Sequence, residues 1–221
     1  DVFNSAYQVK VVKNTFYDFS GWKSSYTRKQ IPDEEMMEWL SNTSRRILEL
    51  HPSNVLEIGC GTGLIMYKII SQIKSYIGID LSEIAIEELT NNIKSNNQIK
   101  EKAKVFQGSA EHLEKMKGKK FDTIIINSVI MFFDSEEYLT NVINECLELL
   151  TENGCLFIGD IIDYNLLKIF RTSVNFFKVS NGKVGELKES IKQDCIRVKD
   201  LLVAPQYFEK LLEISGNISG I

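Results

Sequence analysis

We predict an α/β fold with a doubly wound, mostly parallel sheet from two features of this sequence. Five short runs rich in Val, Ile and Phe are almost continuously apolar, as strands buried on both faces of a parallel sheet are. They cover residues 54–59, 75–80, 103–108, 121–127 and 154–161. The segments between several of these runs carry apolar residues three and four positions apart, which is typical of crossover helices. In such a sheet the ligand lies outside the carboxyl ends of the strands.

Helices are predicted where this three and four spacing persists, including one before the first strand. They cover residues 33–50, 64–73, 82–96 and 135–151. Pro32 suits the start of the first helix, and Ser82 and Ser135 are predicted N-caps of two others. Glu136 and Glu137 then lie in a first turn, where negative charge suits the helix dipole.

Length and composition predict one domain. The 221 residues are 43% hydrophobic, which is enough for one sizeable core. We expect residues 1–50 to form an N-terminal lid and helix, and residues 51–221 to form the core. The formal net charge of −4 gives no long-range attraction to nucleic acid or to an anionic membrane. The lysine-rich stretch at 114–120 is interpreted as a solvated turn.

Cellular context is predicted from the cysteines and from the ends of the chain. Cys60, Cys146, Cys155 and Cys195 form no CxxC pair, so neither a metal site nor a redox dithiol is predicted, and reduced thiols in the cytoplasm are expected. No apolar run approaches the roughly 20 residues of a membrane helix, and the N-terminus lacks the regions of a signal peptide. The chain begins with Asp rather than Met, so it is interpreted as part of something longer.

Three glycines follow the first predicted strand in "VLEIGCGTGLI" (55–65). Their G-x-G-x-G spacing is not a dinucleotide fingerprint, because the sixth position from Gly59 is Leu64 rather than glycine. No Lys-Ser or Lys-Thr follows, so a phosphate-binding P-loop is also excluded. A tight turn between strand and helix remains the alternative to a binding loop.

Two acidic residues favour a binding loop. Asp80 ends the second predicted strand, where a carboxylate can accept hydrogen bonds from both hydroxyls of a ribose. Glu57 lies inside an otherwise apolar strand, where a carboxylate needs a donor or a cation. A nucleoside that carries an ammonium group and needs no pyrophosphate site would satisfy these features, and S-adenosylmethionine fits that description.

The sequence resembles the class I S-adenosylmethionine-dependent methyltransferases, which have a Rossmann-like fold. "VLEIGCGTGLI" is similar to the glycine motif of that family, "YIGIDLS" (76–82) to its second-strand motif, "GSAEHL" (108–113) to its adenine-side segment and "FDTIIINSVIMFF" (121–133) to its fourth-strand motif. The resemblance implies S-adenosylmethionine as cofactor and S-adenosylhomocysteine as product.

Further segments resemble the methyltransferase domains embedded in nonribosomal peptide synthetases and polyketide synthases. They are "GWKSSYTRKQIPDEEMMEWL" (21–40), "CLFIGDIIDYNLL" (155–167) and "VKDLLVAPQYFEKLL" (198–212). This resemblance implies a carrier domain with a phosphopantetheine-tethered substrate and neighbouring synthase domains as partners. It also implies that the last, antiparallel strands of the family are truncated, with "GNISGI" (216–221) interpreted as the start of the sixth strand.

Site residues are carried over from the resemblance. Gly59, Gly61 and Gly63 would lie along the methionine moiety, with Glu57 near its ammonium group. Asp80 would hold the ribose. The remaining cofactor contacts would be Leu81, Ala110 and Glu111 at the adenine, and Asn127 and Ser128 beneath the sulfonium.

Several residues would act on the acceptor side. Trp22, Ser25 and Tyr26 would belong to an N-terminal lid, although aromatic core packing is an equal alternative for Trp22 and Tyr26. His112 is interpreted as a structural or solvated histidine rather than a base. Asp160 ends the fifth predicted strand and is the candidate catalytic residue, with a helix N-cap as its alternative.

The acceptor atom is predicted from departures from the family pattern. Peptide-synthetase N-methyltransferases read N-S-V-V-Q-Y-F and G-D-V-R-N at two strand ends, whereas this chain has Met131 and Phe132, and Ile162 and Asp163, at the varied positions. "GDIID" (159–163) is more similar to O-methylating relatives. Transfer to oxygen is favoured, transfer to nitrogen is the alternative, and a non-catalytic scaffold module is the second class of hypothesis.

Overall fold

The computed structural model describes residues 17–19, 21–178, 184–214, 216 and 218–220, and within them the chain forms a five-stranded sheet. The strands are β1 (Asn54–Ile58), β2 (Ser75–Asp80), β3 (Ala103–Gln107), β4 (Phe121–Asn127) and β5 (Leu150–Gly159). Their order is β3-β2-β1-β4-β5, and all four pairings are parallel. The predicted α/β class is confirmed. Because the strand order reverses between β1 and β4, their carboxyl ends open the crevice where this fold binds ligands.

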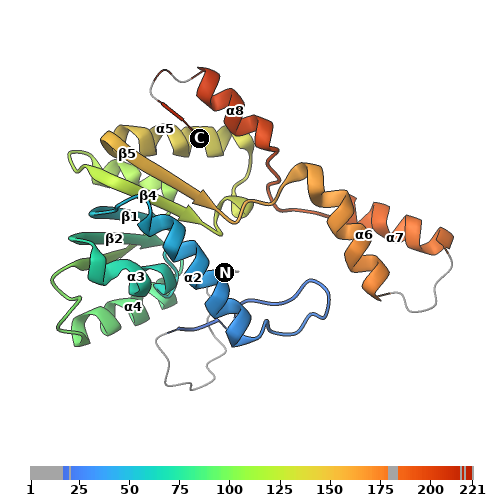
Figure 1. Ribbon diagram of the computed structural model, residues 1–221, viewed down its shortest axis with the longest axis horizontal. Coiled ribbons are helices and arrows are strands. Elements are labelled where there is room, and N and C mark those ends of the chain that lie inside the picture. The colour runs from blue at the N-terminus through green and yellow to red at the C-terminus, as the bar shows by residue number, and fades with distance from the viewer. Residues whose placement is uncertain (1–16, 20, 179–183, 215, 217, 221) are drawn as a thin grey trace.

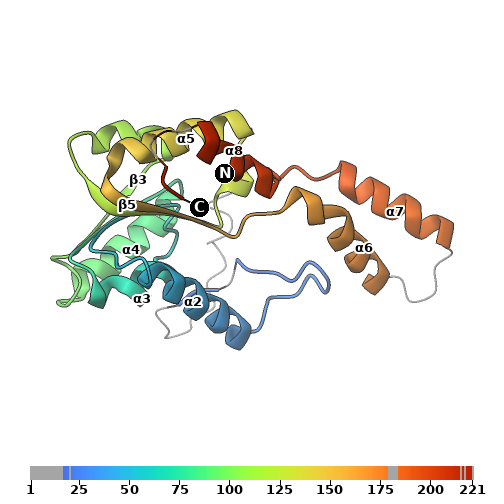
Figure 2. The same cartoon turned by 45° about the horizontal axis from the view of Figure 1, so that its top comes forward.

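Helices cover both faces of the sheet (Figure 1; Figure 2). One face carries α2 (Asp33–Leu48), α3 (Leu64–Ile69) and α4 (Glu83–Ser95), and the other carries α5 (Glu136–Leu149) and α8 (Pro205–Ile214). The predicted N-caps are confirmed, since the hydroxyls of Ser82 and Ser135 accept hydrogen bonds from the backbone N–H groups of Ala85 and Tyr138. Each helix is thereby fixed at the end nearest the carboxyl edge of the sheet.

The apolar core consists of one cluster on each face of the sheet. Leu40, Met66 and Leu89 belong to the cluster under α2, α3 and α4. Leu139 and Cys146 of α5 belong to the opposite cluster. Residues facing both clusters alternate along the central strands, which is why these strands are apolar at nearly every position.

The second predicted helix, residues 64–73, is shorter than expected. Helix α3 ends at Ile69, and the tighter turn η1 (Ile70–Gln72) follows it. The ammonium group of Lys102 donates hydrogen bonds to the carbonyl oxygens of Ile70 and Ile73, at 3.3 and 3.0 Å. A side chain distant in sequence therefore binds the carbonyl groups of the turn that follows this helix.

The fifth strand differs from the predicted range of 154–161 at both ends. It begins at Leu150, immediately after α5, because Leu150 pairs with Phe121 of β4, and the parallel pairing continues from Cys155 with Thr123 after a register shift. It ends at Gly159, because Asp160 has φ +56° and a left-handed residue does not extend a strand. The predicted helix over 135–151 ends earlier, at Leu149, because the next residue, Leu150, already pairs with β4.

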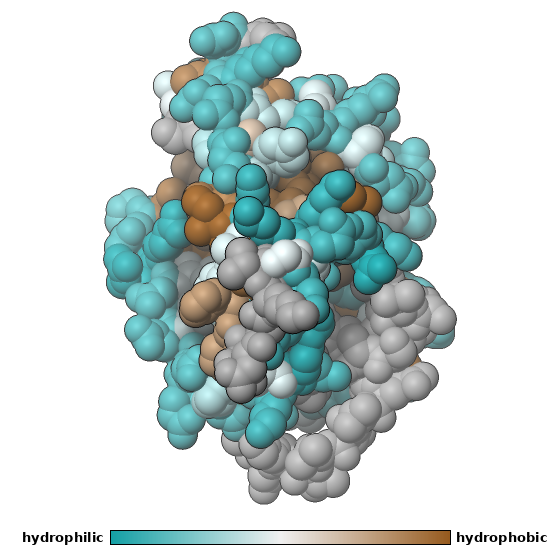
Figure 3. All heavy atoms as spheres, turned by 90° about the vertical axis from the view of Figure 1, so that its right-hand side faces the viewer, coloured by the Kyte–Doolittle hydropathy of each residue, from teal (hydrophilic) through white to brown (hydrophobic). Residues whose placement is uncertain are grey.

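A pair of helices, α6 (Leu167–Lys178) and α7 (Val184–Ile196), extends away from the sheet (Figure 1; Figure 2). The amide of Asn175 joins them by donating to Asp194 at 2.8 Å and accepting from Ser190 at 2.6 Å. Figure 3 shows apolar side chains among polar ones at this end of the molecule. Ile169 and Phe176 of α6 are 67% and 72% exposed, so this helix leaves an apolar face uncovered by the described residues.

The two ends of the chain are only partly described. Residues 17–19 and 21–31 form a loop with an isolated antiparallel bridge between Lys23 and Gln30, and residues 1–16 lie outside the description. After α8, Gly216 and residues 218–220 belong to no strand, so the predicted start of a sixth strand is not seen there, and Asn217 and Ile221 lie outside the description.

Candidate active site

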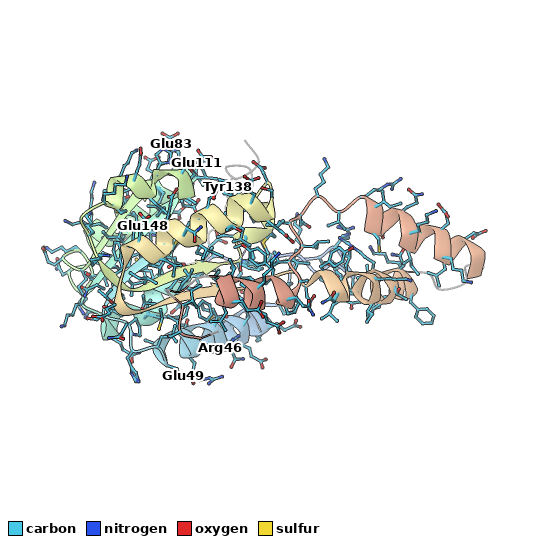
Figure 4. The ribbon with its side chains drawn as sticks, turned by 90° about the horizontal axis from the view of Figure 1, so that it is seen from above. Arg46, Glu49, Glu83, Glu111, Tyr138 and Glu148 are labelled. Atoms are coloured by element: carbon cyan, nitrogen blue, oxygen red, sulfur yellow. The ribbon has the colours of Figure 1, made fainter. Side chains whose placement is uncertain are left out.

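A cavity of about 650 Å³ opens at the carboxyl ends of β1, β2 and β4. It is lined by most of the residues that the sequence selects as a binding site: Trp22, Glu57, Gly59, Gly61, Asp80, Leu81, Ala110, Glu111, Asn127 and Ser128. Gly63, Tyr26 and Asp160 do not line it. A separate hollow over the end of α2 is lined by none of the predicted residues. Figure 4 shows Glu111 and Tyr138, which line the cavity, on the side opposite Arg46 and Glu49 of that helix end.

The glycine loop after β1 needs glycine for conformation and for space. Gly59, Gly61 and Gly63 have φ values of 79°, 49° and 85°, in the left-handed region. A Cβ atom on Gly59 would collide with Val129 Cγ2. Gly63 is the N-cap residue of α3 and packs against Leu89 instead of lining the cavity. The loop therefore brings bare backbone to the cavity at Gly59 and Gly61.

Asp80 connects this loop to the start of α4. Its Oδ2 accepts from the Gly61 N–H at 2.8 Å, and its Oδ1 accepts from the Ser82 N–H at 2.8 Å. Burial raises the pKa of Asp80, while the two backbone hydrogen bonds partly offset that effect. Each carboxylate oxygen can accept a further hydrogen bond, so the side chain can hold two hydroxyl groups of a ligand without releasing the loop.

Glu57 lies at the floor of the cavity and is only 3% exposed. Burial is the main reason that the pKa of Glu57 rises to about 8, with Asp80 adding to the rise. The Tyr76 hydroxyl donates to Glu57 Oε2 at 2.5 Å, which opposes the rise. The carboxyl group is therefore mostly protonated at neutral pH. A cation placed beside it would favour its ionised form.

This pKa predicts a pH dependence of folding stability. An exposed glutamate in the unfolded chain ionises near pH 4.5, whereas Glu57 in the folded chain holds its proton to about pH 8. The free energy of unfolding should fall as pH rises through this window, by at most about 1.4 kcal/mol per pH unit. Urea unfolding of Glu57→Gln between pH 5 and 8 should lack this fall. A constant difference between the variant and the unmodified chain would contradict a raised pKa.

The adenine-side segment follows β3 and forms the short helix η2 (Ala110–Met116). Ser109 and His112 form a capping box, in which His112 Nδ1 accepts from the Ser109 N–H at 3.1 Å. This contact fits the interpretation of His112 as a structural histidine rather than a base. Burial is the main reason that the pKa of the Tyr138 hydroxyl is raised, and the nearby charge of Glu111 adds to the rise.

Asp160 lies beside the cavity and accepts hydrogen bonds from three side chains. Trp39 Nε1 donates to both of its oxygens at 3.3 and 3.1 Å, and Asn127 Nδ2 donates to Oδ2 at 3.1 Å. The Ser128 hydroxyl also donates to Oδ2. The nearest helix, η4 (Tyr164–Leu166), has Asp163 as its N-cap instead. Asp160 is thus joined to the two cavity residues at the end of β4.

The two predicted lid aromatics occupy different places. Trp22 lines the cavity and packs against Trp39, with ring centroids 4.8 Å apart. Tyr26 contacts α6, where its ring packs edge-on against Phe170 and Phe177 and its hydroxyl lies 3.1 Å from Ser173 Oγ. Ser25 is half-buried and does not line the cavity. The loop therefore joins α2 at one point and α6 at another.

Several lining residues were not found from the sequence, among them Asp18, Trp39, Asp134 and Tyr138. Trp39 lies in an amphipathic helix where an aromatic residue is interpreted as core. Asp134 and Tyr138 flank the start of α5, where polar residues indicate only a loop and a cap. No local pattern distinguishes these positions, because tertiary packing brings them to the cavity.

The family is decided by comparison with known sequences. The family described as "Methyltransferase domain" matches residues 51–216, which include the glycine loop, Asp80 and Asp160. The chain belongs to this methyltransferase family. The membership confirms the predicted enzyme class, an S-adenosylmethionine-dependent methyltransferase, and with it the predicted cofactor.

Curated relatives of the methyltransferase chain are very large synthetases. It is 35% identical over 196 residues to the chondramide synthase of Chondromyces crocatus, covering 88% of this chain and 5% of that protein. It is 36% identical over 200 residues to a nonribosomal peptide synthetase of Metarhizium robertsii, covering 88% of this chain and 2% of that protein. The predicted resemblance to synthetase-embedded domains is confirmed.

A solved structure shows the same fold. The plantazolicin methyltransferase BamL, determined with a triazolic desmethyl-plantazolicin analogue and S-adenosylhomocysteine, superposes with a TM-score of 0.56 at 23% identity. The match covers 82% of this chain and 63% of BamL.

Membrane-spanning helices and metal-binding clusters are both absent from the described part of the methyltransferase chain. No helix of the described residues is long and apolar enough to cross a membrane. In the same part of the chain, no group of three or more His, Cys, Asp or Glu side chains could hold a metal ion.

Proposed function

We propose that this methyltransferase domain methylates the amino nitrogen of a carrier-bound aminoacyl group within a peptide-synthesising assembly line. The observation that carries the proposal is the charge of the cavity. Its ionisable lining consists of carboxyl groups, the Cys60 thiol and the Tyr138 hydroxyl, and no Lys, Arg or His of the described residues lines it. The carboxyl groups are those of Asp18, Glu57, Asp80, Glu111 and Asp134.

An acidic lining suits the cofactor. S-adenosylmethionine carries an ammonium and a sulfonium cation, and opposite charges within about 4–6 Å favour each other's ionised forms. In the proposed placement Glu57 receives the ammonium group and Asp80 receives the ribose hydroxyls. Gly59 and Gly61 lie along the methionine chain, and Ala110 and Glu111 border the adenine.

An acidic lining also suits a nitrogen acceptor better than an aliphatic hydroxyl. An α-amino group has a reference pKa near 8, so a useful fraction is neutral and nucleophilic at physiological pH. An aliphatic hydroxyl must lose its proton as it attacks, so its methylation depends more on a positioned base than methylation of a neutral amine does. Methylation of an amine also leaves a cation, which nearby carboxylates stabilise. We assign this role to Asp160, supported by its position beside Asn127 and Ser128.

The cofactor supplies an activated methyl group on a sulfonium that leaves readily. The contribution of the protein is alignment of the acceptor nitrogen with that methyl, which can supply much of the acceleration. Asn127 and Ser128 hold the floor of the cavity at the end of β4, and Asp160 would orient the amine. The lid residues Trp22 and Tyr26 would limit access of water.

The setting is inferred from the relatives. Their names describe synthetases, and this chain spans only a few per cent of their length, so carrier and synthase domains are proposed as its partners. A phosphopantetheine-tethered substrate would reach the cavity from such a carrier. The four cysteines are free, which supports the cytoplasm as the compartment.

Oxygen methylation is the second candidate, because "GDIID" at residues 159–163 and the pair Met131 and Phe132 depart from the N-methylating pattern. Mass spectrometry of carriers loaded with aminoacyl, β-hydroxyacyl and enolisable β-ketoacyl groups distinguishes the two. We expect the aminoacyl carrier to gain one methyl group in the presence of S-adenosylmethionine. Methylation of only the oxygen substrates would refute the proposal.

A further inference from the structure

We propose that Trp39 is a positioning residue, which holds the Asp160 carboxylate at the acceptor side of the cavity. The inference rests on the proposed function in one respect, the placement of Asp160 beside the acceptor. Its physical basis is the pair of contacts from Trp39 Nε1 to Asp160 Oδ1 and Oδ2, at 3.3 and 3.1 Å. One indole N–H thus spans both oxygens of the carboxylate.

The backbone at Asp160 needs such support. Asp160 has φ +56°, and Ser128 at the end of the neighbouring strand has φ +59°. A residue other than glycine in this region costs roughly 1–3 kcal/mol and persists only where its surroundings fix it. The three side-chain donors on Asp160 come from two segments distant in sequence: Trp39 from α2, and the adjacent Asn127 and Ser128 from the end of β4.

Trp39 is well placed to fix the carboxylate because α2 is itself fixed. Met36 and Leu40, on either side of Trp39, are 3% and 0% exposed and belong to the core under the sheet. The indole is half-buried, lines the cavity and reaches Asp160, the residue after β5, from this packed helix. A side chain held in this way can orient a carboxylate with little loss of freedom on binding.

Trp39 also connects Asp160 to the lid. Its ring lies 4.8 Å from that of Trp22. The loop carrying Trp22 contacts α6 through Tyr26. A chain of contacts therefore runs from the lid loop through Trp22 to Trp39, and from Trp39 to Asp160. A change in lid position would reach the Asp160 carboxylate through this indole.

The kinetic test uses Trp39→Phe, which keeps an aromatic ring and removes the N–H donor. We expect kcat for the acceptor to fall about tenfold, as for loss of a hydrogen bond to a charged group, with the KM for S-adenosylmethionine within about twofold. The matched control is Tyr207→Phe, which removes the aromatic hydroxyl 2.7 Å from Thr140 Oγ1, on α8 and outside the cavity. Its kcat should be unchanged.

A double-mutant comparison separates positioning from general packing. If Trp39 acts through Asp160, then Trp39→Phe should cost nothing further in the Asp160→Ala background, which leaves the indole N–H no side-chain acceptor at this position. An equal loss in both backgrounds, or a loss confined to the cofactor KM, would overturn the proposal.

A measurement without catalysis distinguishes this proposal from the proposed function. The chain has two tryptophans, so its ¹⁵N spectrum holds two indole signals, which Trp22→Phe assigns. Asp160→Asn should shift the Trp39 indole N–H signal and speed its exchange with solvent. No change in that signal would refute the positioning contact, whatever acceptor is methylated.

Discussion

Gly61→Val should abolish binding of S-adenosylmethionine while the chain still folds. Gly61 lines the cavity with φ +49°, and its N–H donates to Asp80. A β-branched residue strongly disfavours this backbone conformation, and its side chain would also displace the loop or the ligand. We expect affinity, measured by calorimetry, to fall by at least about a hundredfold.

The matched control is Gly118→Val. Gly118 also has a positive φ, of 88°, but it lies in an exposed turn outside the cavity, where an added Cβ atom would meet no other atom within 4 Å. Its replacement should lower stability by backbone strain alone and leave cofactor affinity unaltered. Equal binding by Gly61→Val and the unmodified chain would show that the glycine loop does not contact the cofactor.

Asp80→Ala should weaken cofactor affinity by roughly ten to a hundredfold, corresponding to about 1.5–3 kcal/mol for hydrogen bonds to a charged group. The ribose is remote from the migrating methyl group, so its interaction is similar in the ground and transition states. The loss should therefore appear in the KM for S-adenosylmethionine, with kcat little changed. Asp80→Asn keeps one acceptor and should cost less.

Asp122→Ala is the control for Asp80→Ala. The Asp122 carboxylate also accepts two backbone N–H groups, those of Ser53 and Asn54, both at 2.7 Å, but at the opposite end of the sheet. Its loss should lower stability and leave the cofactor KM unaltered. If both variants raised the KM equally, the effect of Asp80 would be on folding and not on the ribose.

The fold could be predicted from sequence because its strands are buried on both faces. Continuous apolar runs mark β1 and β4, and the caps Ser82 and Ser135 mark two helices. The ends of β5 could not be predicted in this way. The polar residues 151–153 lie inside the strand because Leu150 pairs with Phe121 of β4 before them, while Asp160 lies outside it because its backbone is left-handed. Both depend on neighbours distant in sequence.

The cofactor side of the site could also be predicted, because its residues directly follow strands. Gly59, Gly61 and Asp80 have this position, and the parallel sheet brings them to one edge. The acceptor side depends on packing between elements. Trp39 lies on α2, 121 residues before Asp160 in the sequence, and only packing of the helix brings its indole to the cavity.

Calorimetric titration of the chain with S-adenosylmethionine tests most directly whether this cavity is a cofactor site. We expect one molecule bound per chain, with affinity retained in Asp122→Ala, reduced in Asp80→Ala and lost in Gly61→Val. Absence of binding to the folded, unmodified chain would contradict this assignment and favour a scaffold module with a methyltransferase fold.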